Sequence, residues 1–337
     1  MRILLVGAPR SGTTWSARAI SRAAGARLVP EPDGPASDIL GALVVNRLGA
    51  FPILSPGEKS GWYKLVWDVA FSGGWPWGDV EVARATGRKL VKIRPAARDH
   101  IVRVLGRSVA LLQPRPQHVV VKSVNCMLSL DWIASRYQPR VVLVRRDPLN
   151  IVSSWMALDW DPAGAAHAQA LAARSRVEGF ELSPPSPSAS RLARTAWTVG
   201  LLLSAMKAAA ETHSDWIVVS HDQACLSPRE SFQGVYRRLG LEWTAEADAY
   251  LTASEDPGFV VYDGNREKHP NVLAHQRDPV LSTVGYASQW QRRFKPGQID
   301  EVLSVLESFR LGEWGPAPAK TDTVPVASTG SSHRTHR

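Results

Sequence analysis

The sequence predicts an α/β fold, a doubly wound parallel sheet with a phosphate-binding loop after the first strand. Four short runs of mostly β-branched residues are nearly continuous, as in parallel strands that helices cover on both faces. Segments with apolar residues three and four positions apart, the spacing of an amphipathic helix, separate these runs. In such a sheet, ligands bind at the carboxyl ends of the strands.

The expected strands cover residues 3–6, 119–121, 141–144 and 217–219. The expected helices cover residues 13–24, 128–137, 151–158, 191–212 and 228–239. Gly240 is a suitable residue to end the last helix. Two stretches do not fit the alternation: residues 51–100, with four tryptophans among glycines and prolines, and residues 159–190, which end in a loop rich in proline and serine.

Residues 7–15 read Gly-Ala-Pro-Arg-Ser-Gly-Thr-Thr-Trp and lie between the first expected strand and the first expected helix. Gly7 and Gly12 permit a tight backbone path, and the free amides and dipole of the following helix favour an anion. The spacing nearly fits the nucleotide-triphosphate loop, but Thr13 occupies the place of its lysine, and Arg10 is the cation within the turn. We therefore expect a phosphorylated ligand at this loop.

The length of 337 residues suits one large α/β domain, which we expect over residues 1–314. Residues 315–337 are rich in Pro, Ala, Thr and Ser without periodicity, so we expect a disordered tail. The formal net charge of +9 favours an anionic ligand. Because the cations form no consecutive block, nucleic acid is not an expected partner.

The two cysteines, Cys126 and Cys225, are too few for a disulfide framework and have no metal-ligand spacing. They favour a reducing cytoplasm. No charged and apolar leader precedes Gly7, and the longest apolar stretch, residues 199–210, is too short to span a bilayer. We therefore expect no membrane span.

The loop resembles the 5′-phosphosulfate loop of sulfotransferases, a Pro-[Lys/Arg]-Ser-Gly-[Thr/Ser]-[Thr/Ser] segment that binds 3′-phosphoadenosine 5′-phosphosulfate (PAPS). The match runs without a gap from Pro9 to Trp15. The family's second signature, a strand followed by an arginine and a serine eight residues later, is similar to Arg146 and Ser154. The resemblance implies that this pair holds the 3′-phosphate, to which a guanidinium offers paired donors.

The resemblance extends, through weaker motifs, to about Phe309. Residues 216–228 are similar to the family's late strand, with His221 in the place of a tyrosine that contacts adenine. Residues 282–285 and 290–294 are similar to the loop that covers the nucleotide and to the start of the helix after it. The donor-binding residues that the resemblance implies are Arg10, Ser11, Gly12, Thr13, Thr14, Trp15, Arg146, Ser154, His221, Thr283, Arg292 and Arg293.

In the cytosolic branch of that family, a strand-end lysine precedes the 3′-phosphate arginine by 24 residues, which is the spacing from Lys122 to Arg146. The resemblance implies that Lys122, with Arg10, stabilises charge on the bridging oxygen of the donor. The alternative is a lysine that extends from a strand end to solvent. That branch has its histidine base two residues later, where this chain has Val124, which takes no proton.

A different residue must therefore act as the base. Glu31-Pro32 resembles the Glu-Pro element of carbohydrate-type and many bacterial sulfotransferases, which implies that Glu31 removes the proton of the acceptor hydroxyl. A loop carboxylate bound to a neighbouring arginine is the alternative for Glu31. Four further candidates for the base remain: Asp33, His100, Asp159 and His167.

The implied reaction is the transfer of a sulfuryl group from PAPS to a hydroxyl of a small-molecule or glycosylated acceptor, without a metal. Residues 51–100 and 159–190 are expected to be insertions that line the acceptor site. The alternative, which we favour for any single tryptophan, is that the tryptophans belong to the core and that the Pro/Ser run is a connector. Two alternatives remain. One is a kinase or nucleotide hydrolase with a phosphate loop, and the other is a non-catalytic nucleotide- or glycan-binding module. The sequence determines neither the acceptor nor the oligomeric state.

Overall fold

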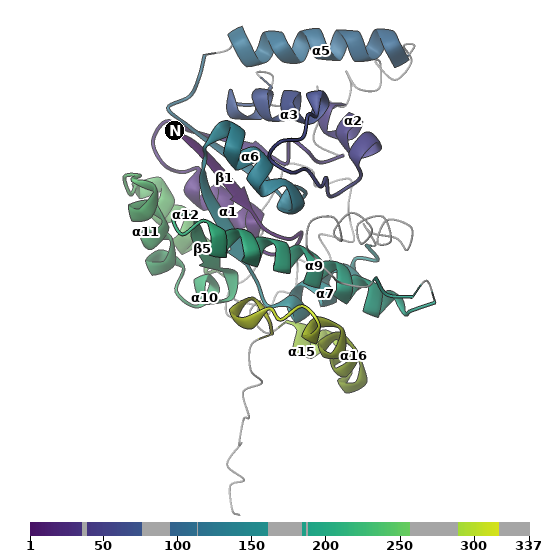
Figure 1. Cartoon of the computed structure of the whole chain (residues 1–337). Coiled ribbons are helices and arrows are strands. Elements are labelled where there is room, and N and C mark those ends of the chain that lie inside the picture. Colours follow the sequence, from purple (N-terminus) through teal and green to yellow (C-terminus); the bar gives the residue numbers. More distant parts are fainter. Residues whose placement is uncertain are drawn as a thin grey trace, which may run out of the picture.

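The computed structural model describes residues 1–35, 39–75, 95–112, 114–160, 184–186, 188–256 and 289–316 (Figure 1). Within these residues, five parallel strands form one sheet in the order β2-β3-β1-β4-β5. Their bounds are β1 Arg2–Val6, β2 Ala26–Pro30, β3 His118–Ser123, β4 Arg140–Arg145 and β5 Ile217–Ser220.

Helices cover both faces of the sheet, which confirms the predicted doubly wound α/β fold. The described helices are α1 Thr13–Ile20, α2 Ile39–Leu48, α3 Gly61–Phe71, α5 Pro95–Leu112, α6 Leu130–Tyr137, α7 Pro148–Ala157, α9 Arg191–Thr212, α10 His221–Leu226, α11 Pro228–Leu239, α12 Ala245–Ser254, α15 Trp290–Arg293 and α16 Pro296–Glu307. Two short 3-10 helices, η1 Met127–Ser129 and η2 Gly312–Trp314, complete the described elements.

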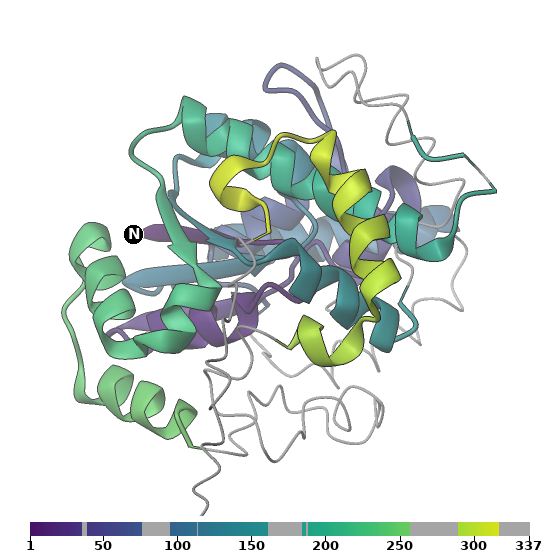
Figure 2. The same cartoon turned by 90° about the horizontal axis from the view of Figure 1, so that it is seen from below.

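The alternation of side chains along β1 shows how the two faces are filled. Ile3 and Leu5 pack into a core with α1, α11 and α12, whereas Leu4 and Val6 face a larger core with α3, α6, α7, α9 and α16. Figures 1 and 2 show α9 and α16 on one side of the sheet and α1 and α11 on the other. Both faces of the strand are therefore apolar, as the continuous runs in the sequence predict.

All four predicted strands are present and extend by one or two residues beyond the expected bounds. The fifth strand, β2, was not among the four apolar runs. It pairs only with β3, and the side chains of its first three residues are half-buried. An edge strand tolerates Arg27 and Pro30 at such positions, and it therefore has no continuous apolar run to mark it.

The helices of the second half of the sequence match their predicted bounds best. Helices α9 and α11 have the expected limits, and Gly240 ends α11 with φ of 70°. Helix α1 ends four residues earlier than expected, and the chain then turns back to β2 through Gly25, whose φ is 67°. Helix α7 begins three residues earlier, where the Asp147 carboxylate caps it by accepting a hydrogen bond from the amide of Leu149 (2.8 Å).

The tryptophan-rich stretch contains an ordered helix, α3, which packs against α2 and α5. Trp67 is fully buried in it, with Tyr63 and Phe71 as ring neighbours, so this tryptophan belongs to the core. Trp62 is half-buried, and the guanidinium of Arg103 lies 4.4 Å from its ring centroid. Trp77 lies outside the described residues, as do most of residues 159–190 and the predicted tail from residue 317 onward.

Within the described ranges, no helix combines the length and the apolar composition that crossing a bilayer requires.

Candidate active site

The loop after β1 has a backbone path that requires glycine at two positions. A Cβ atom on Gly7 would lie 2.7 Å from the carbonyl oxygen of Val144 and 2.4 Å from the Ser11 hydroxyl. Gly12 has φ of 86°, in the left-handed region that side chains disfavour. The loop is therefore closely wrapped at the carboxyl end of β1, between β3 and β4.

This loop has the properties of an anion site. Helix α1 starts directly after Gly12, which has no side chain to cap the first amides, so these donors and the positive end of the dipole face the loop. The Ser11 hydroxyl is fully buried and has no hydrogen-bond partner among the described residues. An unpaired buried hydroxyl is costly, and a phosphate oxygen in this loop is a suitable acceptor for it.

The arginine–serine pair of the second motif lies against the same loop. Arg146 follows β4 and is 8% exposed, and its Nη1 donates a hydrogen bond to the carbonyl oxygen of Arg10 (2.8 Å). Arg10 Nε donates to the hydroxyl of Ser154 on α7 (3.0 Å). On the next residue of α7, Trp155 Nε1 donates to the carbonyl oxygen of Pro9 (2.9 Å). Three hydrogen bonds thus join two motifs that are more than 130 residues apart in the sequence.

A carboxylate that sequence analysis did not assign to the site lies within ion-pair distance of the guanidinium of Arg146. Asp222 Oδ1 lies 4.0 Å from Arg146 Nε, and Asp222 Oδ2 accepts a hydrogen bond from the amide of Asp147 (2.7 Å). Burial opposes ionisation of Asp222, but His221 and Arg146 together hold its pKa below the usual range. The acidic residue in the late strand motif was the available signal for this role.

His221 packs against the phosphate loop. A Cβ atom on Gly12 would lie 1.9 Å from Cδ2 of the imidazole, so the absence of a side chain at Gly12 makes room for the ring. The Trp15 ring meets it edge-on at 5.8 Å. Burial lowers the pKa of His221, and the nearby charge of Arg146 lowers it further. The structure therefore gives His221 a neutral packing role beside the loop, and its contact with adenine stays a prediction.

The register of β2 and β3 brings Glu31 and Lys122 together. Pro30 is the register partner of Lys122, and the next residue, Glu31, donates its amide hydrogen to the carbonyl oxygen of Lys122 (2.6 Å). The two side chains form an ion pair between Nζ and Oε1. The ammonium is 5% exposed and the carboxylate 35% exposed, so Glu31 is the accessible member of the pair.

Asp33 lies two residues further on and is fully buried. The Ser123 hydroxyl is 2.8 Å from Oδ1 and 2.9 Å from Oδ2, and it accepts hydrogen bonds from the amides of Asn125 and Cys126. Burial raises the pKa of Asp33 to about 7, and the charge of Glu31 adds to this rise, against the hydrogen bond from Ser123. The hydrogen bond between Asp33 and Ser123 therefore connects the turn after β2 to the end of β3. Because Asp33 is fully buried, it has no exposed surface that a substrate could contact.

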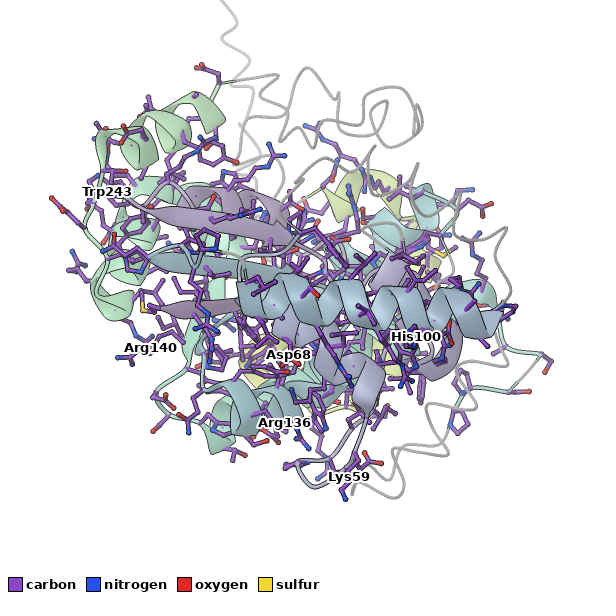
Figure 3. The ribbon with its side chains drawn as sticks, turned by 90° about the horizontal axis from the view of Figure 1, so that it is seen from above. Lys59, Asp68, His100, Arg136, Arg140 and Trp243 are labelled. Carbon is purple, nitrogen blue, oxygen red and sulfur yellow. The ribbon has the colours of Figure 1, made fainter. Side chains whose placement is uncertain are left out.

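The remaining candidates for the base lie elsewhere. His100 is exposed on α5, on the outside of the molecule, and Asp159 is an 89% exposed side chain paired with Arg191 (Figure 3 labels His100). Neither has a hydrogen bond or an ion pair to the phosphate loop in the described part of the chain. His167 and Thr283 lie outside the described residues.

Arg292 and Arg293 lie on α15, which packs against α7. The first residue of α15, Trp290, donates its amide hydrogen to Asn150 Oδ1 (3.1 Å), one turn before Ser154 on α7. Helix α7 therefore connects the basic pair with the serine of the second motif. Whether either arginine contacts a phosphate stays a prediction.

No family model matches the sequence, and no curated protein matches it. Among solved structures, the chain is similar to sulfotransferases, the family that its motifs resemble. The sulfotransferase domain of the Synechococcus olefin synthase is 15% identical with a TM-score of 0.44, covering 92% of this chain and 94% of that chain. The sulfotransferase domain of the curacin biosynthetic pathway is 13% identical with a TM-score of 0.46, covering 90% and 96%. Mouse sulfotransferase SULT7A1, complexed with PAP, is 13% identical with a TM-score of 0.41, covering 93% and 85%.

We predict that Asp33 makes the stability of the protein depend on pH. Between about pH 5 and 6 the unfolded chain has lost this proton while the folded protein keeps it, so the free energy of unfolding falls by about 1.4 kcal/mol per pH unit from this group, and the slope decreases as the pH rises through about 7. Asp33→Asn removes the titration and keeps an oxygen to accept the hydrogen bond of Ser123. Urea unfolding across this range should therefore give a shallower slope for the variant.

Asp215→Asn, at an exposed position, is the matched control and should keep the slope of the wild type. Parallel slopes for wild type and Asp33→Asn would contradict the assignment of a protonated carboxyl to Asp33.

Proposed function

We propose that this chain is a PAPS-dependent sulfotransferase that transfers a sulfuryl group to a hydroxyl of a small-molecule or glycosylated acceptor. The contact between the phosphate loop and the Arg146–Ser154 pair carries this proposal. A nucleotide with phosphates on both its 3′ and 5′ oxygens needs two anion sites a short distance apart, whereas an ordinary nucleotide needs one. The missing loop lysine argues against a kinase or a nucleotide hydrolase.

The residues at the two sites suit the two phosphates. The 5′ side would be held by the first amides of α1, by the buried hydroxyl of Ser11 and by Arg10. The 3′ phosphate would be held by Arg146 and Ser154, because a fixed guanidinium gives paired donors to phosphate oxygens. When bound, PAPS supplies a sulfuryl group attached to a phosphate leaving group.

Glu31 and Lys122 are the residues that we assign to proton transfer and charge stabilisation. Glu31 is exposed enough to reach an acceptor hydroxyl and remove its proton. Once Glu31 holds that proton, its charge is gone, and the buried ammonium of Lys122 no longer has a counter-ion in the pair. Lys122 can then stabilise negative charge near the phosphate loop, where low exposure to water strengthens its effect.

Calorimetry with 3′,5′-adenosine bisphosphate and with AMP tests the donor site. We expect the wild type to prefer the bisphosphate, and Arg146→Ala to weaken its binding by about 10- to 100-fold, the value of a charged hydrogen bond of about 1.5–3 kcal/mol. The same variant should lose most of the preference over AMP, because the lost contact is specific to the 3′-phosphate.

Arg145→Ala is the matched control. Arg145 is the preceding residue but pairs with Glu313, away from the loop, so both affinities should stay near those of the wild type. A wild type that binds AMP as tightly as the bisphosphate would exclude PAPS as the donor.

Transfer of label from sulfur-labelled PAPS to a panel of sugars, phenols and glycosides tests the chemistry. We expect Glu31→Gln to lower kcat by about 10²- to 10⁴-fold, because general base catalysis is lost, while the affinity for the bisphosphate stays near that of the wild type. Asp215→Asn, at an exposed carboxylate in the turn before β5, should keep full activity.

Equal kcat in Glu31→Gln and wild type would remove Glu31 from the mechanism. If the wild type labels no acceptor but hydrolyses ATP in the presence of Mg²⁺, the chain is instead a nucleotide hydrolase.

A further inference from the structure

A cleft lies at the amino edge of the sheet, where the strands begin, whereas the phosphate loop lies at the carboxyl edge, where they end. The cleft has a volume of about 340 Å³ and is formed by the start of β1, the second halves of α3 and α5, the segment before β3 and the end of α6. Arg2 lines it at the first residue of β1, whereas the phosphate loop follows the last residue. The intervening strand is about 13 Å long, so the two sites are separate.

Cations dominate this cleft. Its walls include Arg2, Lys64, Arg107 and Arg115 but a single carboxylate, that of Asp68. Lys64 Nζ lies 2.7 Å from Asp68 Oδ2. Figure 3 shows Asp68 beside α5.

Tyr137 accounts for the other oxygen of Asp68. Its hydroxyl donates a hydrogen bond to Asp68 Oδ1 (2.9 Å), so the carboxylate is already satisfied by two partners from within the cleft. The negative charge of Asp68 therefore balances Lys64 and leaves the three guanidiniums of the cleft without a counter-ion from its walls.

Arg107 and Arg115 are exposed and have no ion-pair partner in the part of the chain that the structure describes. Arg2 is held in place, because its Nη1 donates to the carbonyl oxygen of Tyr137 (3.3 Å) and its guanidinium lies 6.0 Å from the centre of the Phe71 ring. An anion in this cleft would be attracted by all three positive charges.

One wall of the cleft is apolar. Leu111 is 76% exposed, and it lines the cleft with Ala110. The rings of Phe71 and Tyr137 lie 5.1 Å apart on the facing side. A ligand that fills this cleft thus meets donors for an oxyanion and a surface for a small ring or an alkyl chain.

We propose that this cleft binds a phosphate monoester attached to an apolar group, at a site separate from the donor site. Three guanidiniums suit the dianion of a monoester, whose three terminal oxygens accept paired hydrogen bonds. The exposed leucine and the aromatic pair suit the organic part. The ester is either a soluble metabolite or a lipid headgroup. This inference does not depend on the proposed function.

Calorimetry with phenyl phosphate tests the soluble form, and co-sedimentation with phosphatidylcholine vesicles, with or without phosphatidic acid, tests the lipid form. We expect at least one of the two to bind, and the double variant Arg107→Ala/Arg115→Ala to weaken that binding by about tenfold or more. Inorganic phosphate should bind more weakly than phenyl phosphate because it lacks the apolar group.

Two variants are controls with different purposes. Arg103→Ala removes an arginine of the same helix that lies over Trp62, outside the cleft, so binding should stay within about twofold of the wild type. Arg146→Ala weakens the donor site and should also leave binding within about twofold. Circular dichroism melting of each variant checks that it is folded.

Binding of phenyl phosphate alone identifies a soluble ester, and binding only to vesicles with phosphatidic acid identifies a lipid. The proposal is wrong if neither probe binds the wild type or if the double variant binds as the wild type does. The proposal is also wrong if Arg103→Ala weakens binding as much as the double variant does, because such a result would indicate an effect of the protein's net charge. Loss of binding in Arg146→Ala would assign the probe to the phosphate loop instead.

Discussion

The candidate site depends on the hydrogen bonds that join Arg10, in the loop after β1, to residues that follow the neighbouring strand β4. Its side chain donates to Ser154 and its carbonyl oxygen accepts from Arg146, so one residue of the phosphate loop connects both residues of the second motif to that loop. Arg10 has φ of 72°, a left-handed conformation that costs an ordinary residue about 1–2 kcal/mol. Hydrogen bonds to charged groups are worth about 1.5–3 kcal/mol each, so these contacts offset that cost.

The parallel register is the second constraint, because it decides which side chains meet at the carboxyl edge. Pairing of Pro30 with Lys122 places the residue after β2 next to the last residues of β3, and this makes the ion pair with Glu31. A shift of one residue would turn Lys122 to the other face of the sheet, into the position of Ser123. The hydrogen bond between Ser123 and Asp33 opposes such a shift, since it joins the same two segments on that other face.

Local sequence patterns were sufficient for the elements that they mark directly. The apolar runs predicted four strands, and the glycines of the loop predicted its tight backbone path, because strand, turn and helix start are set by neighbouring residues. Strand β2 was missed because an edge position requires fewer apolar side chains. The pair of Lys122 and Glu31 joins residues 91 positions apart, and no local pattern carries such a contact.

Local sequence patterns also do not show which charged residues the fold leaves accessible or brings together. The resemblance favours Glu31 as the base but leaves Asp33 as a rival, and it is the fold that separates the two, by burying Asp33 against Ser123 and leaving Glu31 accessible. The cleft at the amino edge is likewise invisible in the sequence, because its cations come from segments as far apart as Arg2 and Arg115.

The two proposed anion sites, at the carboxyl and the amino edge of the sheet, would attract a ligand by different means. At the carboxyl edge the principal cations are buried and already face carboxylates, Lys122 with Glu31 and Arg146 with Asp222, so backbone amides and the dipole of α1 supply much of the attraction. Burying these charges costs solvation free energy, but salt screens buried charges only weakly. At the amino edge the guanidiniums are exposed, so salt screens them strongly. On these proposals, a ligand at the buried edge would be selected by the fixed positions of the donors around it, whereas at the exposed edge net charge would attract the ligand and the apolar wall would provide the selectivity.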